Sequence, residues 1–289
     1  MKIIRAEHLG MCFGVRDAIA LALREADKMP LTILGELVHN EAVVADLREK
    51  GIQTESQVAA VTTKTVMVTA HGTSQRAMNL AKARGLNLLE ATCPLVHLAH
   101  RSLAALRQAG YHPVIIGKRS HVEVRGMTED LEEFDVVLSE ADVNDLGERP
   151  RFGIVAQTTQ PILKVHHLVT LIQQRFPQSE VRFSDTVCQP TKQRQTAAIE
   201  LARQSDAVVV IGGAESNNTR ELVTTCNQVC RRVFHVQEAR QLRPEWFVEA
   251  QTVGITAGTS TPERVVDEVE QWLRQCFVPP QESSISGSF

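Results

Sequence analysis

Three cysteines, Cys12, Cys93 and Cys188, are the residues whose positions point most directly to chemistry. They are 81 and 95 residues apart, about the length of one small α/β unit, and each precedes a predicted helix in a turn-like setting. A helix N-terminus lowers the pKa of a thiol and so favours the thiolate, the form that binds metal. One cysteine per unit could therefore converge on a central point and hold an iron–sulfur cluster with one iron free of protein thiolate. Three buried cysteines without a metal are the alternative.

The other three cysteines fit packing roles better. Cys226 and Cys230 are four residues apart and are predicted on one face of a helix, with valines nearby at positions 223, 229 and 233. That apolar company favours a core over a metal site. Cys276 ends a predicted helix beside Trp272 and Leu273 and is also expected to be structural.

Histidines and one acid supply candidate groups for anion binding and proton transfer. His39, His71 and His121 lie at strand ends or in polar turns, where an imidazole can donate to a phosphate oxygen or carry a proton near neutral pH. His121 and Glu123 are two residues apart, so in an extended segment both would point the same way and could share a ligand. Glu123 would need a partly dry site to act as a proton donor, and an exposed ion pair is its alternative.

Four junctions share the order strand, small polar turn, helix: residues 70–74, 157–161, 212–219 and 257–262. Each offers hydroxyls or amides and a helix N-terminus at the carboxyl end of a strand, where α/β folds bind phosphate. Helix capping alone would explain any single junction. The four together predict a shared anion site.

The elements that must position these residues alternate along the chain. Apolar, β-branched runs typical of buried parallel strands occur at 31–34, 66–69, 114–116, 136–138, 154–155, 208–211 and 253–256. Stretches with helical spacing lie between them at 15–27, 75–84, 96–108, 163–176, 192–204 and 263–276. This alternation predicts the α/β class.

Composition narrows the possible partners. The chain has 289 residues, 43% of them hydrophobic, which predicts two or three packed domains. A net charge of −3 and only 12 aromatic residues disfavour binding to nucleic acid or to an anionic membrane surface. No apolar run approaches the roughly 20 residues of a membrane helix. The absence of an apolar signal-peptide core near Met1, together with the cysteine usage, predicts a reducing, cytoplasmic location.

Taken together and in this order, the motifs resemble the 4-hydroxy-3-methylbut-2-enyl diphosphate reductase (IspH/LytB) family from Cys12 to about Pro262. The matching motifs are Gly10-x-Cys12-x-Gly14-Val15, Val38-His39-Asn40, Ala70-His71-Gly72, Ala91-Thr92-Cys93-Pro94-Leu95-Val96, His121-x-Glu123-Val124, Gln157-Thr158-Thr159, Thr186-x-Cys188, Ser216-Asn217-Asn218-Thr219 and Thr256-Ala257-Gly258-x-Ser260-x-Pro262.

The resemblance implies a role for each matching residue. Cys12, Cys93 and Cys188 would bind a [4Fe–4S] cluster whose fourth iron faces the substrate, and Glu123 would be the proton donor. The residues implied to bind the substrate are His39, His71, His121, Thr158, Ser216, Asn217, Asn218 and Ser260. Thr158 would lie near the substrate hydroxyl, Asn217 at a neighbouring binding position, and the others where the diphosphate is held.

The implied reaction is the last step of the methylerythritol phosphate route to isoprenoids. Two electrons and two protons convert (E)-4-hydroxy-3-methylbut-2-enyl diphosphate to isopentenyl and dimethylallyl diphosphate, and the hydroxyl leaves as water. Because the cluster moves electrons singly, an outside donor such as ferredoxin or flavodoxin with its reductase is implied.

We therefore predict three small α/β domains with parallel-type sheets, arranged pseudo-threefold around a central iron–sulfur cluster. Their expected bounds are residues 14–92, 93–184 and 185–277, with the N-terminal strand segment 1–13 joined to the third. Residues 278–289, rich in Pro and Ser, are predicted to be a flexible tail.

Departures from the family pattern are modest. Phe13 stands where many members have Ala, His97 where Thr is frequent and Asn217 where Ser is frequent. Val122 replaces the proline of the usual His-Pro-Glu, which costs rigidity rather than a functional group. We expect these changes to affect rate and partner choice.

Two other classes of function remain open from the sequence. A redox or oxygen sensor would need the three thiolates but not Glu123 or Thr158. A zinc protein would use the same cysteines with a histidine.

Overall fold

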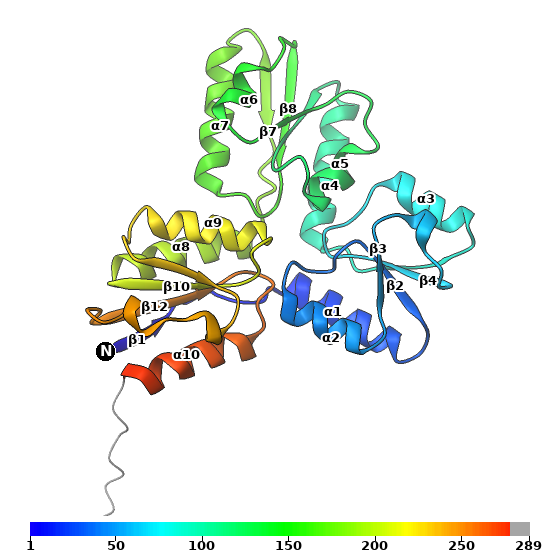
Figure 1. Ribbon diagram of the computed structural model, residues 1–289. Coiled ribbons are helices and arrows are strands. Elements are labelled where there is room, and N and C mark those ends of the chain that lie inside the picture. Colours follow the sequence, from blue (N-terminus) through cyan, green and yellow to red (C-terminus); the bar gives the residue numbers. More distant parts are fainter. Residues whose placement is uncertain (278–289) are drawn as a thin grey trace, which may run out of the picture.

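The computed structural model describes residues 1–277, which form three lobes that meet at the centre of the molecule (Figure 1). Each lobe contains one four-stranded parallel sheet, which confirms the predicted α/β class with three parallel sheets. The predicted tail, 278–289, lies outside the described residues. Among the described residues no helix combines the length and the apolar character needed to cross a membrane.

The three sheets define the three units by which the molecule is described below. In the first unit the strand order is β3 (Gln53–Glu55), β2 (Leu31–Leu34), β4 (Thr65–Val68), β5 (Asn87–Glu90). In the second it is β7 (Asp135–Val137), β6 (His112–Ile116), β8 (Arg151–Ala156), β9 (Glu180–Phe183). In the third it is β11 (Val233–Val236), β10 (Ala207–Ile211), β12 (Thr252–Ala257), β1 (Lys2–Arg5).

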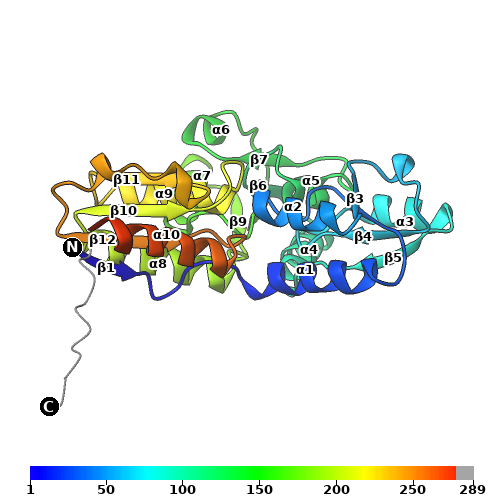
Figure 2. The same cartoon turned by 60° about the horizontal axis from the view of Figure 1, so that its bottom comes forward.

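Helices cover both faces of each sheet. The first unit carries α1 (Phe13–Ala26), α2 (Glu41–Glu49) and α3 (Gln75–Ala83). The second carries α4 (Pro94–Gln108), α5 (Val122–Thr128), α6 (Glu140–Asn144) and α7 (Ile162–Arg175). The third carries α8 (Gln189–Arg203), α9 (Asn217–Asn227) and α10 (Glu263–Phe277). In Figure 2, α1, α4 and α8 lie toward one side of the molecule and α2, α5 and α9 toward the other.

The alternation of side chains along each strand explains why helices cover both faces of each sheet. In β6, Ile115 packs with α4 and α5, whereas Val114 and Ile116 pack with α6 and α7. Successive residues of a strand point to opposite faces, so a strand that is apolar on both faces needs helices on both. The central strands are therefore continuous apolar runs, as the sequence indicates.

Each cysteine lies where the chain passes from one unit to the next. The edge strand β5 belongs to the first sheet, but the helix that follows it, α4, packs on β6 and β8 of the second. In the same way β9 leads to α8 on the third sheet, and β1 leads to α1 on the first. Cys93, Cys188 and Cys12 stand at the start of these three helices.

The strands that the sequence does not predict are all at sheet edges. β3, β5, β9 and β11 each have one neighbouring strand, and most of their side chains are exposed or half-buried. An edge strand next to solvent does not need a continuous apolar run, so it carries a weak hydrophobic signal. The short helices α5 and α6 and the nine-residue helix α2 are also absent from the predicted stretches.

Two expectations about the other cysteines are wrong. Cys226 and Cys230 do not share a helix face, because α9 ends at Asn227. Both thiols are nevertheless buried in one apolar cluster, while Val229 is 40% exposed and takes no part in it. Cys276 is exposed, so it has no packing role in the core.

Candidate active site

Three equivalent backbone hydrogen bonds hold the cysteines at the centre. Cys12, Cys93 and Cys188 are the N-cap residues of α1, α4 and α8. The N–H of Cys93 donates to the carbonyl of Ala70, that of Cys188 to Thr158, and that of Cys12 to Thr259, each at 3.0 Å. Each acceptor lies in the junction that follows the strand next to the edge of its sheet. The fold thus ties every cysteine to one of the predicted anion-binding turns.

The three thiols are near one another and are partly buried. A Cβ atom on Gly14, two residues after Cys12, would lie 2.6 Å from Cys93 Sγ, so α1 and Cys93 approach closely. Burial raises the pKa of the Cys93 thiol and raises the pKa of the Cys188 thiol to about 11, and the charge of Cys12 contributes to both. The expected lowering of the thiol pKa at helix N-termini is therefore wrong for Cys93 and Cys188, because desolvation raises the pKa by more than the helix N-terminus lowers it.

The donor set fits an iron–sulfur cluster. Three free thiols face a shared region, and a bound cation would reverse the unfavourable burial of their thiolates. The buried Arg194 guanidinium is close enough to interact with Cys12 and Cys188 and is held by the carbonyls of Gly10 and Pro190 at 3.0 Å. Within residues 1–277 no three His, Cys, Asp or Glu side chains surround a single-ion site. A cluster makes a different demand, since each thiolate binds its own iron.

Three imidazoles form a second group, which we call the histidine cluster: His39, His71 and His121. Their ring centroids are 5.4 to 6.0 Å apart. Burial lowers the pKa of His71 to about 4 and that of His121 to about 2, so both rings are neutral in this structure. His39 Nδ1 lies 2.8 Å from the Glu36 carboxylate. Two neutral rings and one ring beside an acid offer N–H groups to an anion.

The geometry of His121 and Glu123 differs from the expected extended segment. His121 is the N-cap of α5, and its Nδ1 accepts a hydrogen bond from the Glu123 backbone N–H at 3.2 Å. Because Nδ1 accepts, the proton of the neutral ring is on Nε2, which remains free to donate. The His121 ring is thus held by the Glu123 backbone, while the Glu123 carboxylate is bonded to Thr158.

The third unit supplies hydroxyl and amide groups. Ser216 caps α9 by accepting from Thr219 N, and Asn217 Nδ2 donates to Thr159 Oγ1 at 3.3 Å. Asn218 Oδ1 accepts from Thr259 N at 2.9 Å, which places α9 against the turn before α10. Ser260 follows in that turn and is buried.

Contact between the third and first units joins this group to the histidine cluster. Gly213 packs so tightly on the His39 backbone that a Cβ there would clash with the carbonyl oxygen and lie 2.8 Å from the carbonyl carbon. The Ser216 N–H donates to the Gly213 carbonyl at 3.1 Å. The eight predicted substrate-binding residues are thereby brought to one region by contacts among all three units.

Three of these residues have buried polar atoms without a hydrogen-bond partner among the described residues. The atoms are His71 Nδ1, Asn218 Nδ2 and Ser260 Oγ. Buried polar groups in folded proteins are nearly always paired, so an unpaired set in one region indicates a ligand that completes it. All three can donate a hydrogen bond, which suits an anion.

Glu123 is the buried acid between the cysteines and the anion-binding groups. Its side chain is 1% exposed, Oε1 accepts from Thr158 N at 2.7 Å, and Oε2 accepts from Thr158 Oγ1 at 2.9 Å. Burial raises the pKa of Glu123 to about 7, although both hydrogen bonds lower it. A carboxyl with this pKa can hold and release a proton near neutral pH, and its two hydrogen bonds connect it to Thr158.

Sequence patterns do not show the contacts of several residues that shape the site. Glu36 and Arg194 interact with the histidine cluster and the cysteines, and Gly213 fixes the approach of two units. For Glu36 the local signal is the spacing of three residues between Glu36 and His39. Arg194 belongs to a motif that the sequence shares with the family, Arg194-Gln195, and Gly213 lies in the predicted junction 212–219, but the contacts that both make across units are decided by the tertiary structure.

Three α/β units, each built on one parallel sheet, surround one shared site. This architecture is that of a known class of proteins. The chain belongs to the LytB protein family, which matches residues 3–274. It is 38% identical over 277 residues to a protein from Trichlorobacter lovleyi and 36% identical over 277 residues to one from Geotalea uraniireducens. Both matches cover 95% of this chain and 98% of the relative, and both relatives are named 4-hydroxy-3-methylbut-2-enyl diphosphate reductase.

Solved structures agree with the fold. The E-1-hydroxy-2-methyl-but-2-enyl-4-diphosphate reductase from Plasmodium falciparum superimposes with a TM-score of 0.89 at 25% identity and covers 96% of this chain and 89% of its own. A second reductase structure, described as the terminal enzyme of the non-mevalonate pathway, has a TM-score of 0.69 at 33% identity and covers 95% and 100%.

Proposed function

We propose that the chain is an iron–sulfur reductase acting on (E)-4-hydroxy-3-methylbut-2-enyl diphosphate in the last step of the methylerythritol phosphate pathway. The observation that carries the proposal is the junction of three groups: thiols, unpaired buried donors and a protonatable acid. Glu123 acts electrostatically on Cys93 and Cys188, and its partner Thr158 is bonded through its carbonyl to the Cys188 N–H. The relatives carry the same activity in their names.

The cysteines Cys12, Cys93 and Cys188 would hold a [4Fe–4S] cluster with one iron open to the substrate. When bound, the cluster supplies electrons and a Lewis-acidic iron for the substrate hydroxyl. The Arg194 guanidinium beside two of the cysteines offsets the negative charge of their thiolates.

The diphosphate is held by the histidine cluster together with Ser216, Asn217, Asn218 and Ser260. The neutral His71 and His121 rings and the unpaired Asn218 and Ser260 atoms donate to its oxygens. A diphosphate at this point also satisfies the buried groups, so binding removes the energetic cost of leaving them unpaired. The allylic hydroxyl then lies toward Thr158 and Glu123.

Glu123 supplies a proton so that the hydroxyl leaves as water, with Thr158 passing it on. A second proton adds to the carbon skeleton. The double bond moves in isopentenyl diphosphate and keeps its position in dimethylallyl diphosphate, depending on which carbon receives that proton. Burial keeps Glu123 protonated up to about neutral pH, the condition that an acid catalyst requires. Two electrons enter one at a time from a small donor such as ferredoxin or flavodoxin with its reductase. We place the enzyme in the cytoplasm on the basis of its cysteine usage.

The test is anaerobic purification followed by iron and sulfide analysis and a turnover assay with a reduced donor. The proposal predicts cluster iron and sulfide and conversion of the hydroxylated diphosphate. Glu123→Gln should keep the cluster and ligand binding and lower turnover by about 10² or more. A fully loaded cluster without turnover would contradict the enzymatic function, and zinc without iron or sulfide would favour a zinc protein.

A further inference from the structure

A cavity of about 930 Å³ opens beside the histidine cluster and extends beyond the residues described so far. Its wall includes His39 and His121, so it leads directly onto that cluster. The other lining residues come from all three units: the segments 34–36, 56–59 and 73–80 of the first, 118–129 of the second, and Glu215 and Arg220 of the third.

Four cationic side chains line this cavity: Arg76, Lys118, Arg125 and Arg220. Arg125 is paired with Glu129 at 3.3 Å, and Arg220 bonds the Glu215 backbone and side chain at 3.2 and 3.5 Å. The half-buried Lys118 has no ion pair within residues 1–277. A free ammonium group inside a cavity is available for an incoming anion.

Lys118 and Arg220 approach the histidine cluster from different units. Both positive charges add to the effect of burial in lowering the pKa of His121. The Lys118 backbone is anchored because its N–H donates to Gln157 Oε1 at 3.0 Å, and Gly117 before it leaves no space for a side chain against Gln157 and Val124. The position of Lys118 is therefore set by the residue that precedes Thr158.

The residues assigned to the diphosphate carry little formal charge. His71 and His121 are neutral, and the others are hydroxyls and amides apart from His39. A diphosphate bears several negative charges, and the chain as a whole has a net charge of −3, which repels it at long range. The cavity is lined by four cationic side chains and by three carboxylates, those of Glu36, Glu129 and Glu215, so it keeps one more positive than negative formal charge.

We propose that Lys118 and Arg220 form an outer diphosphate-binding subsite that captures the substrate and passes it to the histidine cluster. The inference rests on the proposed function for the identity of the substrate. Lys118 and Arg220 thus capture the substrate and take no part in the reaction itself. They are therefore expected to control kcat/KM and its dependence on salt, and to leave kcat nearly unchanged.

The experiment compares wild type with Lys118→Gln, Arg220→Gln and the matched control Arg125→Gln, which removes one positive charge from the same cavity. At low ionic strength we expect the first two variants to lose roughly tenfold in kcat/KM, with kcat within about twofold and a flatter salt dependence. Arg125→Gln should change kcat/KM by less than about twofold, and Lys118→Arg should recover most of the loss. Iron content and circular dichroism check that every variant is folded and loaded.

A second measurement is the affinity for inorganic pyrophosphate by calorimetry, which needs no turnover. Weaker binding by Lys118→Gln and Arg220→Gln than by Arg125→Gln supports the subsite even if the wild type fails to reduce the substrate, a result that would defeat the proposed function alone. Equal pyrophosphate affinity and equal kcat/KM in all three variants would overturn the subsite and leave the reductase intact. A loss confined to kcat would also overturn it.

Discussion

Glu123 is a residue on which burial and hydrogen bonding act in opposite directions. Desolvation raises its pKa, the two hydrogen bonds from Thr158 lower it, and desolvation prevails. The result, about 7, is well above the ordinary value of 4.5. The same shift has consequences for both stability and activity.

Stability should fall as the pH rises through the pKa of Glu123. The folded-state pKa is raised, so the stabilising contribution is complete below about 4.5 and is lost as the pH passes about 7. We expect a loss of about 3 kcal/mol in the free energy of unfolding of the metal-free chain between pH 5 and pH 8.5. Urea denaturation under reducing conditions measures it. The free energy of unfolding of Glu123→Gln should change with pH by about 3 kcal/mol less over this range. Parallel plots of unfolding free energy against pH for the two proteins would contradict the assignment.

Thr158 connects Glu123 to the anion-binding region, and Thr158→Val removes only its hydroxyl. Loss of the proton path should lower kcat by about tenfold or more. Loss of a hydrogen bond to the carboxylate should raise the pKa of Glu123 further, so the alkaline limb of the kcat profile moves to higher pH. Steady-state kinetics from pH 6 to 9 test both effects. Thr158→Ser should retain the wild-type profile, whereas an unshifted limb in Thr158→Val would argue against the coupling.

Among the elements, the starts of α1, α4 and α8 decide whether the cysteines can work together. Each helix begins at a cysteine whose side chain makes no capping hydrogen bond. The backbone N–H of each cysteine is tied to a neighbouring turn. Gly14 in the first turn of α1 allows the close approach to Cys93. The starts of these helices thus bring the three cysteines together, and the cysteine side chains do not cap the helices.

Gly14→Ala tests this approach. Alanine is the better helix former, so helix propensity alone would make the variant more stable. The added methyl would lie 2.6 Å from Cys93 Sγ and should displace that thiol, lowering bound iron by more than about half while the far-UV circular dichroism stays unchanged. Gly147→Ala, where nothing lies within 4 Å, is the matched control. Full iron loading in Gly14→Ala would show that the contact is unimportant.

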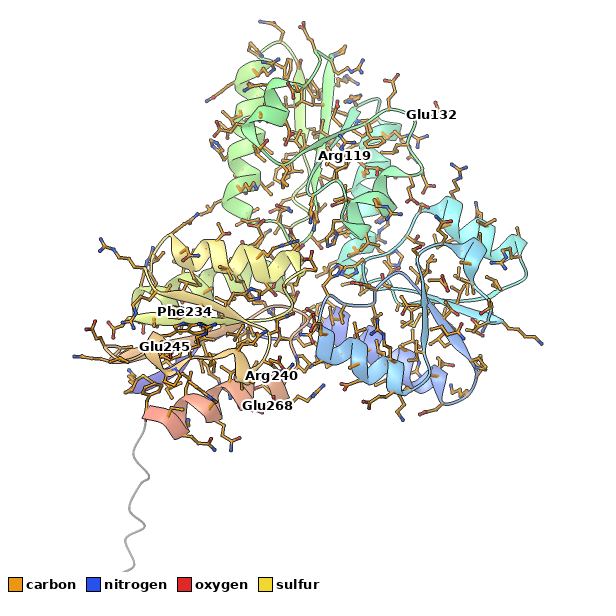
Figure 3. All side chains as sticks on the ribbon, in the orientation of Figure 1. Arg119, Glu132, Phe234, Arg240, Glu245 and Glu268 are labelled. Carbon is orange, nitrogen blue, oxygen red and sulfur yellow. The ribbon has the colours of Figure 1, made fainter. Side chains whose placement is uncertain are left out.

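At the scale of the molecule, three similar units meet and no single unit holds the site. Phe234 and Glu245 lie on the third unit away from the meeting point (Figure 3), and Phe234 stacks on Trp246 within that unit. The predicted site residues lie instead where the units touch, and at one of these contacts Gly213 packs closely on the His39 backbone. Such a contact sets how closely the third unit approaches the first.

Gly213→Ala should loosen that approach. The clash is with backbone atoms, which cannot move aside as the end of a flexible side chain can. We expect each unit to remain folded and the affinity for inorganic pyrophosphate to fall by about tenfold, because the hydroxyl and amide donors no longer meet the histidine cluster. Calorimetry measures the affinity, with Gly147→Ala as control. Unchanged affinity would mean that the contact does not position the ligand groups.

Part of the fold and much of the candidate site could be predicted because their signals are local. The central strands, such as residues 208–211, are apolar on both faces, and the three cysteine motifs each stand before a helix. The edge strands β5 and β9 could not be predicted, since they are half-exposed and their sequence is mixed.

The sequence by itself determined which residue types stand at the helix starts and strand ends, since caps, turns and apolar runs depend on neighbours along the chain. Only the tertiary structure decided their chemistry. It showed that burial raises the pKa of Cys93 and Glu123, that His121 caps α5, and that Gly213 closes on His39. These properties arise from atoms distant in sequence, because desolvation and close packing depend on what surrounds a group in space.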